Sequence, residues 1–538
     1  METTVTSAKL QQTNETLQKR NAELEAKVKQ QKAVIEQFLQ EILLLKDKRF
    51  GRSADVLPKQ QDLDMVFDEA EVTEAVEKEA VQVEGYERKK CGRKPLPKEL
   101  PRIEKIIDIP EADKMCACGH EKHVMGQEIS EKLLHIPEIV YVLQLIRLVY
   151  GCSFCDGSAD EDTPAVTVAP LPPAIIPKGI ATASLLSTVF SNKFIDHLPY
   201  YRQEQRFKRL NITISRQDMS NWQGKSTQVL KPLFELLQKQ IAIGDVAAID
   251  ETRLQVLNEP TQPDTKKGYM WVVRGGPPDK IVYIYHYDET RSSKVAKTLL
   301  NGFSGYLMSD AYSGYKALTK KTEGIINVFC WSHSRRMYVD AAKVQKKAGT
   351  AHEAVSRIKK LYSIERDLRK QVEDDTLTLN EFVEKRKKLT EPVFDNLQKW
   401  LAKKAESITP SSLVGKAIHY TLNNWKQLIR YVEHPYLGPD NNVMEREGIK
   451  PFVIGRKNWL FSGSPAGAAS SSLLFSLITT AKEHKLNPQV YLYYILEKAP
   501  YINSHEDWVS LLPWNVSLPK TLGRDFIEHT LNSLLATL

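Results

Sequence analysis

The sequence predicts a multidomain α/β protein. Its 538 residues exceed what one core holds, and a prior of about 150 residues per domain suggests three or four units. A seven-residue apolar repeat runs through residues 1–50, whereas the stretch after Gly244 alternates apolar and polar residues as strands do. We therefore expect a long amino-terminal helix, intervening modules, and then a domain in which strands and helices alternate.

The charge of the chain is only mildly positive but unevenly distributed. Lys and Arg number 75 against 67 Asp and Glu, which gives a formal net charge of +8. Residues 61–87 are strongly acidic, within a predicted acidic linker over 51–90, so the remainder is more basic than the total implies. The basic run at 87–102 predicts either a contact with a phosphate backbone or a solvated linker.

The chain has no feature of secretion or membrane insertion. Its first residues, METTVTSAKLQQ, lack the charged-then-apolar pattern of a leader, and no apolar run approaches the length of a membrane span. Six cysteines in a chain of this size fit a reducing compartment, where paired cysteines bind metal. We expect a soluble cytoplasmic protein with no membrane partner.

Residues 1–50 predict a coiled coil. The sustained repeat favours self-association as a homodimer or larger assembly, with a single helix docked on its own protein as the alternative. Asparagine at the a positions, as at Asn14 and Asn21, favours a two-stranded parallel pairing. The seam residues are Leu10, Leu17, Leu24, Phe38 and Leu45 at one position, interrupted by Gln31, and Asn14, Asn21, Val28, Ile35 and Ile42 at the other.

Residues 91–160 predict a zinc-ribbon-like module. CACGH supplies Cys116 and Cys118, and GCSFCDG supplies Cys152 and Cys155 with the spacing that directs two thiolates at one tetrahedral Zn²⁺. Two predicted strands between the pairs would bring them together. His120 is an alternative ligand, and reduced cysteines without metal are the alternative for the whole module.

Residues 161–230 predict a helical DNA-binding segment that resembles a helix-turn-helix. The last of three predicted helices begins at Ser215, a suitable N-cap residue. Helical spacing directs Met219 and Trp222 inward and turns a polar face to solvent, which a major groove would accommodate. Short polar helices of small bundles are the alternative. The outward residues expected to contact DNA are Arg216, Gln217 and Asn221, with Ser220 beside them.

The catalytic domain is expected over 240–485. DVAAIDETRLQVL, GYMWVVRGG and KIVYIYHY predict strands, SSKVAKTLL a helix, GYLMSDAYSGYKAL a strand that enters a helix, and GIINVFCW a fifth strand. This is the order of a ribonuclease-H-like core, in which the first and fourth strands are neighbours. Asp250 and Asp310 would then lie side by side, and two such carboxylates attract a divalent cation. Glu445, on a later helix, is the candidate third acid.

The motifs of this domain closely resemble those of the insertion-sequence-66 group of bacterial DDE transposases. They are AIDET, SDAYSGY, CWSHSRRM and the long stretch that begins DNNVMEREGIKPFVIGRKNWLFSGS, and LLPWN near the carboxyl end is also similar. The resemblance implies a catalytic triad of Asp250, Asp310 and Glu445. The sequence departs from the family at Glu447, where an arginine or similar residue is more common after Glu-Arg.

The resemblance also implies two-metal phosphodiester chemistry. Two Mg²⁺ or Mn²⁺ ions bridged by Asp250 and Asp310, one also held by Glu445, would activate water and stabilise the leaving 3′ oxygen, and a 3′-hydroxyl in place of water would join DNA ends. Taken singly, each acid also has a structural interpretation, as a strand residue, a helix cap or a first-turn residue. Further residues expected to contact DNA are His333, Arg335, Arg336, Lys450, Arg456, Lys457 and Trp459, the last of which either stacks on a base or simply packs.

The function implied is that of a DNA transposase acting in the bacterial cytoplasm, associated with the nucleoid. Its partners would be double-stranded DNA, as transposon ends and target, a second copy of the chain, and companion proteins of the same element. The alternatives are a DNA-binding regulator and a structure-specific nuclease that does not join ends. A charged helical insertion is expected over about 345–435, and a carboxy-terminal module over 486–538.

Overall fold

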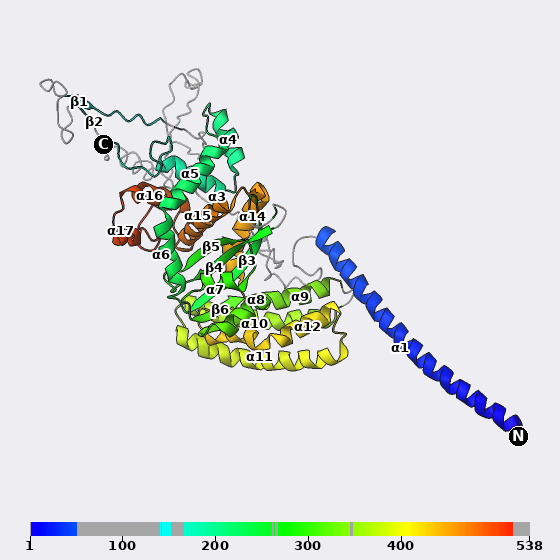
Figure 1. Cartoon of the computed structure of the whole chain (residues 1–538). Helices are drawn as coiled ribbons and strands as arrows, with labels where there is room; N and C mark the ends of the chain where they lie inside the picture. Colours follow the sequence, from blue (N-terminus) through cyan, green and yellow to red (C-terminus); the bar gives the residue numbers. More distant parts are fainter. Residues whose placement is uncertain are drawn as a thin grey trace, which may run out of the picture.

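A computed structural model describes residues 2–50, 140, 142–151, 166–168, 170–260, 263, 267–344 and 348–519. Figure 1 shows a body built around one sheet, with a single long helix projecting from it. The mixed α/β class is therefore confirmed for the described residues. No helix among them is long and apolar enough to cross a membrane.

The projecting helix is α1 (Glu2–Phe50), a single uninterrupted element of 49 residues. Its predicted seam residues are open to solvent, with exposed fractions of 59% for Leu17 and Ile35 and 57% for Phe38. Near its carboxyl end, Glu41 Oε1 accepts a hydrogen bond from Lys416 Nζ at 3.1 Å. Among the described residues the helix meets the body only near its carboxyl end, and its described seam side chains such as Leu17, Ile35 and Phe38 are not covered by them.

The central sheet has six strands in the order β5-β4-β3-β6-β7, and β8 pairs with the far end of β3. The first three strands are antiparallel, whereas β6 and β7 run parallel to β3. The predicted adjacency of the first and fourth strands is confirmed by the β3–β6 pairing. The bounds are β3 (Val246–Val256), β4 (Lys267–Gly275), β5 (Val282–Asp288), β6 (Gly305–Ser309), β7 (Ile325–Phe329) and β8 (Phe461–Ser462).

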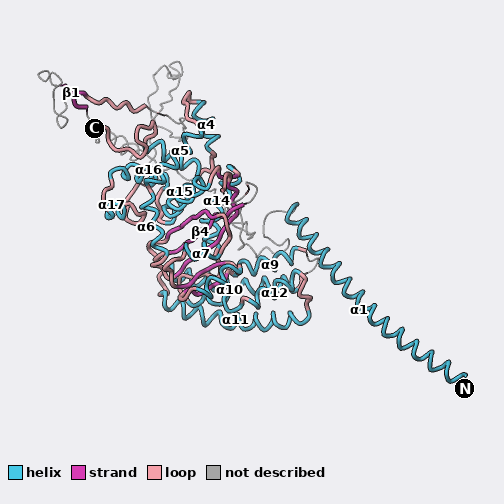
Figure 2. The backbone as a smooth tube through the Cα atoms, viewed as in Figure 1, coloured by secondary structure: helices cyan, strands magenta, loops and turns pink. Residues whose placement is uncertain are grey.

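Helices lie on both sides of this sheet, as Figure 2 shows in cyan around the magenta strands. The long α15 packs on β5, where its Ser476 and Thr480 hydroxyls accept hydrogen bonds from the edge-strand amides of Tyr285 and Tyr283. The bounds on this part of the chain are α7 (Ser293–Leu299), α8 (Ser313–Lys321), α9 (Trp331–Lys343), the π-helix η3 (Met444–Ile449), α14 (Lys450–Trp459), α15 (Pro465–Glu483), α16 (Pro488–Lys498), η4 (Ala499–Tyr501) and α17 (His505–Ser510).

The insertion is entirely helical apart from its turns, as its 3.6-residue period predicted. Its two long helices pack against each other, and α10 also packs on α9, which follows the last sheet strand. Apolar side chains of α10 such as Ile358 and Leu361 are fully buried at these contacts. The bounds are α10 (Thr350–Glu373), α11 (Leu379–Ser407), α12 (Leu413–Asn423), α13 (Trp425–Ile429) and η2 (Arg430–Glu433).

Before the sheet, helices form the segment expected to bind DNA. Ser215 caps α5 through a reciprocal pair of contacts with Asp218, and Met219 and Trp222 are buried as predicted. The turn between α4 and α5 includes Asn211 in the left-handed backbone region, with φ of 58°, which asparagine tolerates. The bounds are α3 (Ala183–Phe194), α4 (Tyr200–Arg209), α5 (Arg216–Val229) and α6 (Lys231–Ile241).

Two predicted modules lie mostly or wholly outside the described residues. The acidic linker over 51–90 and the zinc ligands Cys116, Cys118, Cys152 and Cys155 are among the undescribed parts, so the structure does not test them. On either side of Cys152 and Cys155 in the sequence, β1 (Val149–Gly151) and β2 (Val166–Val168) form a short antiparallel pair. Residues 520–538 of the carboxy-terminal module are also undescribed.

Candidate active site

Asp250 and Asp310 lie together where β3 and β6 separate. The parallel ladder pairs Ala248 with Met308 as its last position, and each aspartate lies two residues further along its strand direction. The register therefore carries both carboxylates to the same edge of the sheet. Asp250 lies within β3, which continues to pair with β4, whereas Asp310 follows the end of β6.

Glu445 reaches the same edge from the π-helix η3. A close approach of backbone to sheet holds this helix, because a Cβ at Gly448 would lie 3.3 Å from both Tyr283 and Val272. The Tyr285 hydroxyl donates a hydrogen bond of 2.6 Å to the Gly448 carbonyl. Such π-turns are rare and are frequent at functional sites. The local geometry fixes how the Glu445 side chain projects.

The three acids act on one another electrostatically. Burial raises the pKa of Asp250 to about 8, and the carboxylates of Glu251, Glu445 and Asp310 act in the same direction. This is the behaviour of like charges gathered where water is scarce. The cation-free site therefore favours a protonated Asp250 at neutral pH.

Glu445 is also met by two cationic or titratable side chains of α9. Arg336 Nη2 lies 3.5 Å from Glu445 Oε2, and His333 Nε2 lies 3.9 Å from Glu445 Oε1. Burial lowers the pKa of His333 below its ordinary value, although Glu445 opposes this shift. The His333 Nδ1 atom is buried without a hydrogen-bond partner. His333 and Arg336, both predicted from the sequence, are thus brought to the acids.

Sequence reasoning missed a second group beside the acids. Glu251, with a side chain only 2% exposed, bonds to Arg291 Nε and to the Tyr315 hydroxyl. Arg291 Nη2 also lies 3.7 Å from Asp310 Oδ2, and its guanidinium stacks 3.8 Å over the Tyr312 ring. Glu251 and the two tyrosines stand within the quoted motifs AIDET and SDAYSGY, but nothing in the pattern marked Arg291.

The donor set is suited to a hard divalent cation. Carboxylate oxygens are the ligands that Mg²⁺ and Mn²⁺ prefer, and a cation would relieve the repulsion that raises the pKa of Asp250. Within the described part of the chain, no three His, Cys, Asp or Glu side chains are close enough together to form a metal site. Asp250, Asp310 and Glu445 therefore share one edge of the sheet without forming a ready-made metal site, and as ligands of one cation they would have to lie closer together than they do in this structure.

The adjacent basic stretch divides into exposed and anchored side chains. Lys457 is exposed and Lys450 is half-buried. Arg456 instead bonds to the Thr252 hydroxyl at 2.9 Å and to the Arg253 carbonyl, so it ties α14 to the strand that carries Asp250. An arginine used in this way has fewer donors left for a phosphate than the sequence suggested.

Of two further residues expected at the DNA, Trp459 is half-buried against other aromatic rings and Arg335 is buried. The Trp459 ring packs 6.2 Å from Phe475 and 6.4 Å from Phe194, and it covers Gly455. Of the two roles predicted for this side chain, the structure displays the packing one. Arg335 is only 6% exposed, because it lies on the inner face of α9, whereas Arg336 faces the acids.

Glu447, the acid that departs from the expected pattern, faces away from the other acids. Its carboxylate accepts a hydrogen bond of 2.8 Å from Arg446 Nε, and its charge acts on Lys482 of α15 and on Tyr283. Asp440 holds the start of this helix, since its carboxylate accepts from the Asn442 amide at 3.1 Å. Glu445 rather than Glu447 therefore points to the sheet edge that holds Asp250.

The predicted DNA-reading residues lie on a different surface. Arg216, Gln217 and Asn221 are exposed on α5, and Gln217 donates to Asn221 at 3.1 Å. This helix packs on α15 rather than on the strand ends that carry the acids. Arg202 of the preceding helix reaches Asn458 of α14 at 3.5 Å. The helical segment and the basic stretch thus meet.

Comparison with known families finds matches along most of the chain. A family described as "Transposase IS66 family" matches residues 178–470, and "IS66 C-terminal element" matches 476–514. A domain described as "zinc-finger binding domain of transposase IS66" matches 113–156, and "Transposase C of IS166 homeodomain" matches 37–104. The first match alone covers more than half of the chain.

Curated relatives from Sinorhizobium fredii (strain NBRC 101917 / NGR234) match over most of both chains. The uncharacterized protein y4jD is 33% identical over 436 residues, which are 78% of this chain and 81% of that protein. The uncharacterized protein y4hP is 27% identical over 507 residues, 89% of this chain and 87% of the other. The likeness therefore extends well beyond the acid-bearing strands.

Proposed function

We propose, because this chain belongs to the IS66 family of transposases, that it is a DNA transposase that cleaves the ends of its own insertion sequence and joins them to target DNA. The observation that carries the proposal is the convergence of Asp250, Asp310 and Glu445 at one edge of the sheet. The strand order and the parallel β3–β6 pair support a ribonuclease-H-like catalytic core.

In this proposal Asp250, Asp310 and Glu445 are the metal ligands. Bound Mg²⁺ or Mn²⁺ ions would activate the attacking oxygen and stabilise the leaving 3′ oxygen of a phosphodiester. Arg336 and His333 orient the Glu445 carboxylate in the cation-free protein, and Arg291 does the same for Asp310. Glu251 supports Arg291 from the buried side, so the chain contributes positioned charge and no covalent nucleophile.

Other parts of the chain would supply DNA binding and assembly. The exposed face of α5 carries polar side chains that are suited to the major groove of duplex DNA. The exposed Lys457 carries a positive charge that is suited to its phosphates. The zinc-finger match over 113–156 supports structural Zn²⁺ held by Cys116, Cys118, Cys152 and Cys155. The uncovered seam of α1 supports a homodimer, and companion proteins of the same element would act with it.

The test is cleavage of labelled DNA that carries the element's terminal repeats, in Mg²⁺ or Mn²⁺. We expect Asp250→Ala, Asp310→Ala and Glu445→Gln each to reduce cleavage by at least about 100-fold, because each removes a ligand needed in the transition state. Glu447→Gln is the matched control, since it changes the same charge two residues away on the side facing α15, and it should retain activity within a few-fold. Cleavage that survives Glu445→Gln but not Glu447→Gln would refute the assignment of the third ligand.

The products distinguish the alternative functions. Joined donor and target strands would support transposition, whereas cutting without joining would indicate a structure-specific nuclease. Specific binding to the repeats without any metal-dependent cutting, even after the companion proteins are added, would indicate a DNA-binding regulator.

A further inference from the structure

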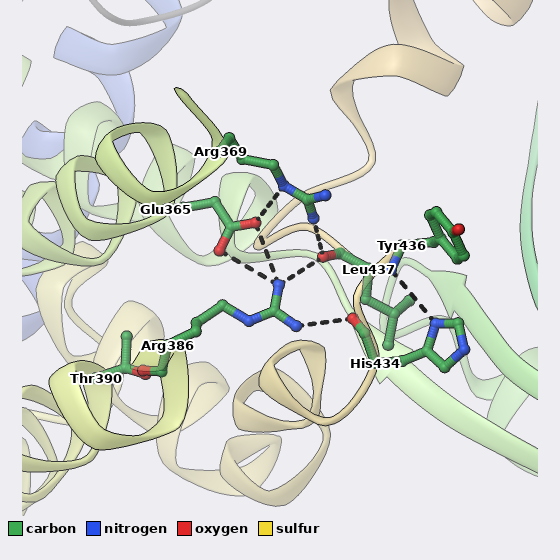
Figure 3. Close-up of polar contacts among 7 residues, drawn as sticks. All are labelled: Glu365, Arg369, Arg386, Thr390, His434, Tyr436 and Leu437. Carbon is green, nitrogen blue, oxygen red and sulfur yellow. Dashed lines mark hydrogen bonds and ion pairs between the residues drawn. The ribbon is translucent and has the colours of Figure 1, made fainter. Parts of the chain in front are cut away.

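A buried ionic cluster links the helical insertion to the loop before Glu445. Its members are Glu365 and Arg369 of α10 and Arg386 of α11, which we name the insertion clamp (Figure 3). Arg386 is fully buried, at 0% exposure, and its Nη1 atom lies 3.2 Å from Glu365 Oε1. Arg369 Nε contacts the same carboxylate oxygen at 2.9 Å. One carboxylate thus holds two guanidinium groups side by side.

Both guanidinium groups donate to the backbone of the same loop. Arg386 Nη2 donates to the His434 carbonyl at 2.7 Å, and its Nη1 donates to the Leu437 carbonyl at 2.9 Å. Arg369 Nη2 donates to the Leu437 carbonyl as well, at 2.7 Å. Figure 3 shows both arginines pointing from the insertion helices at these carbonyls. The loop belongs to no helix or strand at these residues, and the two arginines fix its backbone at His434 and at Leu437.

The fixed loop leads directly into the acid site. The Pro439 carbonyl accepts from the Trp331 amide at 2.8 Å, and the Asn441 amide donates to Cys330 Sγ at 3.3 Å, at the start of the helix that carries His333 and Arg336. The Glu445 amide then donates to the Asn441 carbonyl at 3.1 Å. Hydrogen bonds at Pro439, Asn441 and Glu445 thus hold the chain at intervals between the clamp and the acid.

The cluster is expensive to bury, and Arg386 Nε lies in it without a hydrogen-bond partner among the described residues. A buried ion pair repays its desolvation only when its geometry is good and its remaining donors are bonded, and apolar residues of similar volume are often at least as stabilising. The fork of Arg386 is matched to carbonyls that apolar side chains would leave without these donors. Phe382 lies beneath both guanidinium groups, 4.5 Å and 4.6 Å from them, and limits their motion.

We propose that the insertion clamp is a positioning device, in which Arg386 and Arg369 fix the loop at His434 and Leu437 and thereby set the place of Glu445 relative to Asp250. This inference rests on the proposed function of the acids. It assigns the insertion a role inside the catalytic site, in addition to any contact it makes with DNA or the partner subunit. Supporting groups behind metal ligands typically change metal affinity or activity by about 10–100-fold when they are lost.

The test uses the full-length protein and a charge-free replacement of the clamp, Glu365→Leu with Arg369→Met and Arg386→Met, which approximately keeps the volume and removes the hydrogen bonds of both arginines to the loop. Arg386→Lys, which keeps the charge but not the fork, is the second variant. Arg357→Met is the control, because Arg357 also joins the two insertion helices, by donating to Asn396 of α11. Its other hydrogen bonds go to Glu353 of its own helix, and none of them reaches the loop in the described part of the chain. Amide hydrogen exchange over 438–449 and the Mg²⁺ dependence of cleavage are measured for each.

In the charge-free variant we expect two changes of about tenfold each. Amide hydrogen exchange over 438–449 should become faster, and the Mg²⁺ concentration that gives half-maximal cleavage should rise. Both changes should be smaller in Arg386→Lys. DNA binding in Ca²⁺ should not change. Adding Glu445→Gln to the charge-free variant should reduce cleavage by a smaller factor than the same substitution does in the intact chain, because both changes act through the Glu445 carboxylate. Unchanged exchange, unchanged Mg²⁺ dependence, or an equal effect of Arg357→Met would overturn the inference. If the intact protein does not cleave DNA, the proposed function fails, and hydrogen exchange together with Mn²⁺ affinity still decides the clamp.

Discussion

At the candidate site, the acids differ in whether a basic side chain lies beside them. Burial raises the pKa of Glu251, and its bonds to Arg291 and the Tyr315 hydroxyl oppose that shift. Burial likewise raises the pKa of its neighbour Asp250, to about 8, and the nearby carboxylates of Glu251, Glu445 and Asp310 add to the shift. The two adjacent acids thus share burial but differ in the partners that stabilise their charged forms.

The state of Asp250 leads to a prediction about stability. An acid whose pKa is higher in the folded protein than in the unfolded chain stabilises the fold below its unfolded pKa, and this contribution is lost as the pH rises to about 8. Asp250→Asn removes the charge and keeps the shape. We expect the cation-free variant to melt about 2–5 °C above the intact protein at pH 8, with a smaller difference at pH 5, which lies only just above the ordinary aspartate pKa of 3.8.

The measurement is thermal unfolding in a chelating buffer at both pH values, repeated with added Mg²⁺. The cation should raise the melting temperature of the intact protein more than that of Asp250→Asn, because only the former retains the ligand. Asp279→Asn, in the exposed turn between β4 and β5, controls for the loss of one negative charge. A variant that melts below the intact protein at pH 8 would contradict the raised pKa.

Among the elements, the short helices hold their positions through specific end contacts. Ser215 Oγ accepts from the Asp218 amide at 3.1 Å, while the Asp218 carboxylate accepts from the Ser215 amide at 3.1 Å. This reciprocal cap satisfies donors that the first turn of any helix leaves unpaired. The π-helix η3 is held differently, by the close approach of Gly448 to the sheet.

The cap of α5 can be tested separately from its proposed contact with DNA. We expect Ser215→Ala to destabilise the helical segment by about 1 kcal/mol, since the Asp218 amide loses its acceptor. Ser220→Ala, exposed on the same helix, should change stability by less than about 0.5 kcal/mol. Urea unfolding followed by Trp222 fluorescence measures both, and equal effects of the two substitutions would show that the cap contributes nothing.

For the molecule as a whole, the conspicuous feature is that the exposed seam of α1 is separate from the sheet edge that carries the acids. The helix α1 projects from the body with its seam exposed, and it contacts the insertion side through Glu41 and Lys416 (Figure 1). A two-stranded coiled coil would cover the seam and hold two acid sites in one particle. A line of apolar side chains as long as the α1 seam is rarely left exposed to water.

The coiled coil can be broken without disturbing the body. We expect Leu24→Glu with Ile35→Glu to convert a dimer into a monomer, because both side chains would face like charges in the seam. Lys19→Glu with Ala26→Glu is the control, since these residues lie on the outer face of the predicted heptad. Light scattering after size exclusion gives the masses, and a seam variant that remains dimeric would place the contact elsewhere.

Much of the catalytic domain was predictable because its signals are local. The strand at β3, the cap at Ser215 and the burial of Met219 and Trp222 follow from neighbouring residues, and the structure confirms them, although burial along β3 does not alternate strictly. The anchoring of Arg456, the packing of Trp459 and the burial of Arg335 were not predictable, because each depends on a partner distant in sequence. A basic or aromatic residue in a motif looks the same whether it faces a ligand or its own core.

The sequence by itself determined the family, the order of the elements and the three acids to examine, because periodicity and motif are properties of the chain. Only the tertiary structure decided which acids share an edge, that Glu447 faces away, and that Arg291 and the insertion clamp stand behind the site. Strand register and buried ionic contacts join residues tens to hundreds of positions apart. Their geometry is settled by packing and desolvation rather than by local propensity.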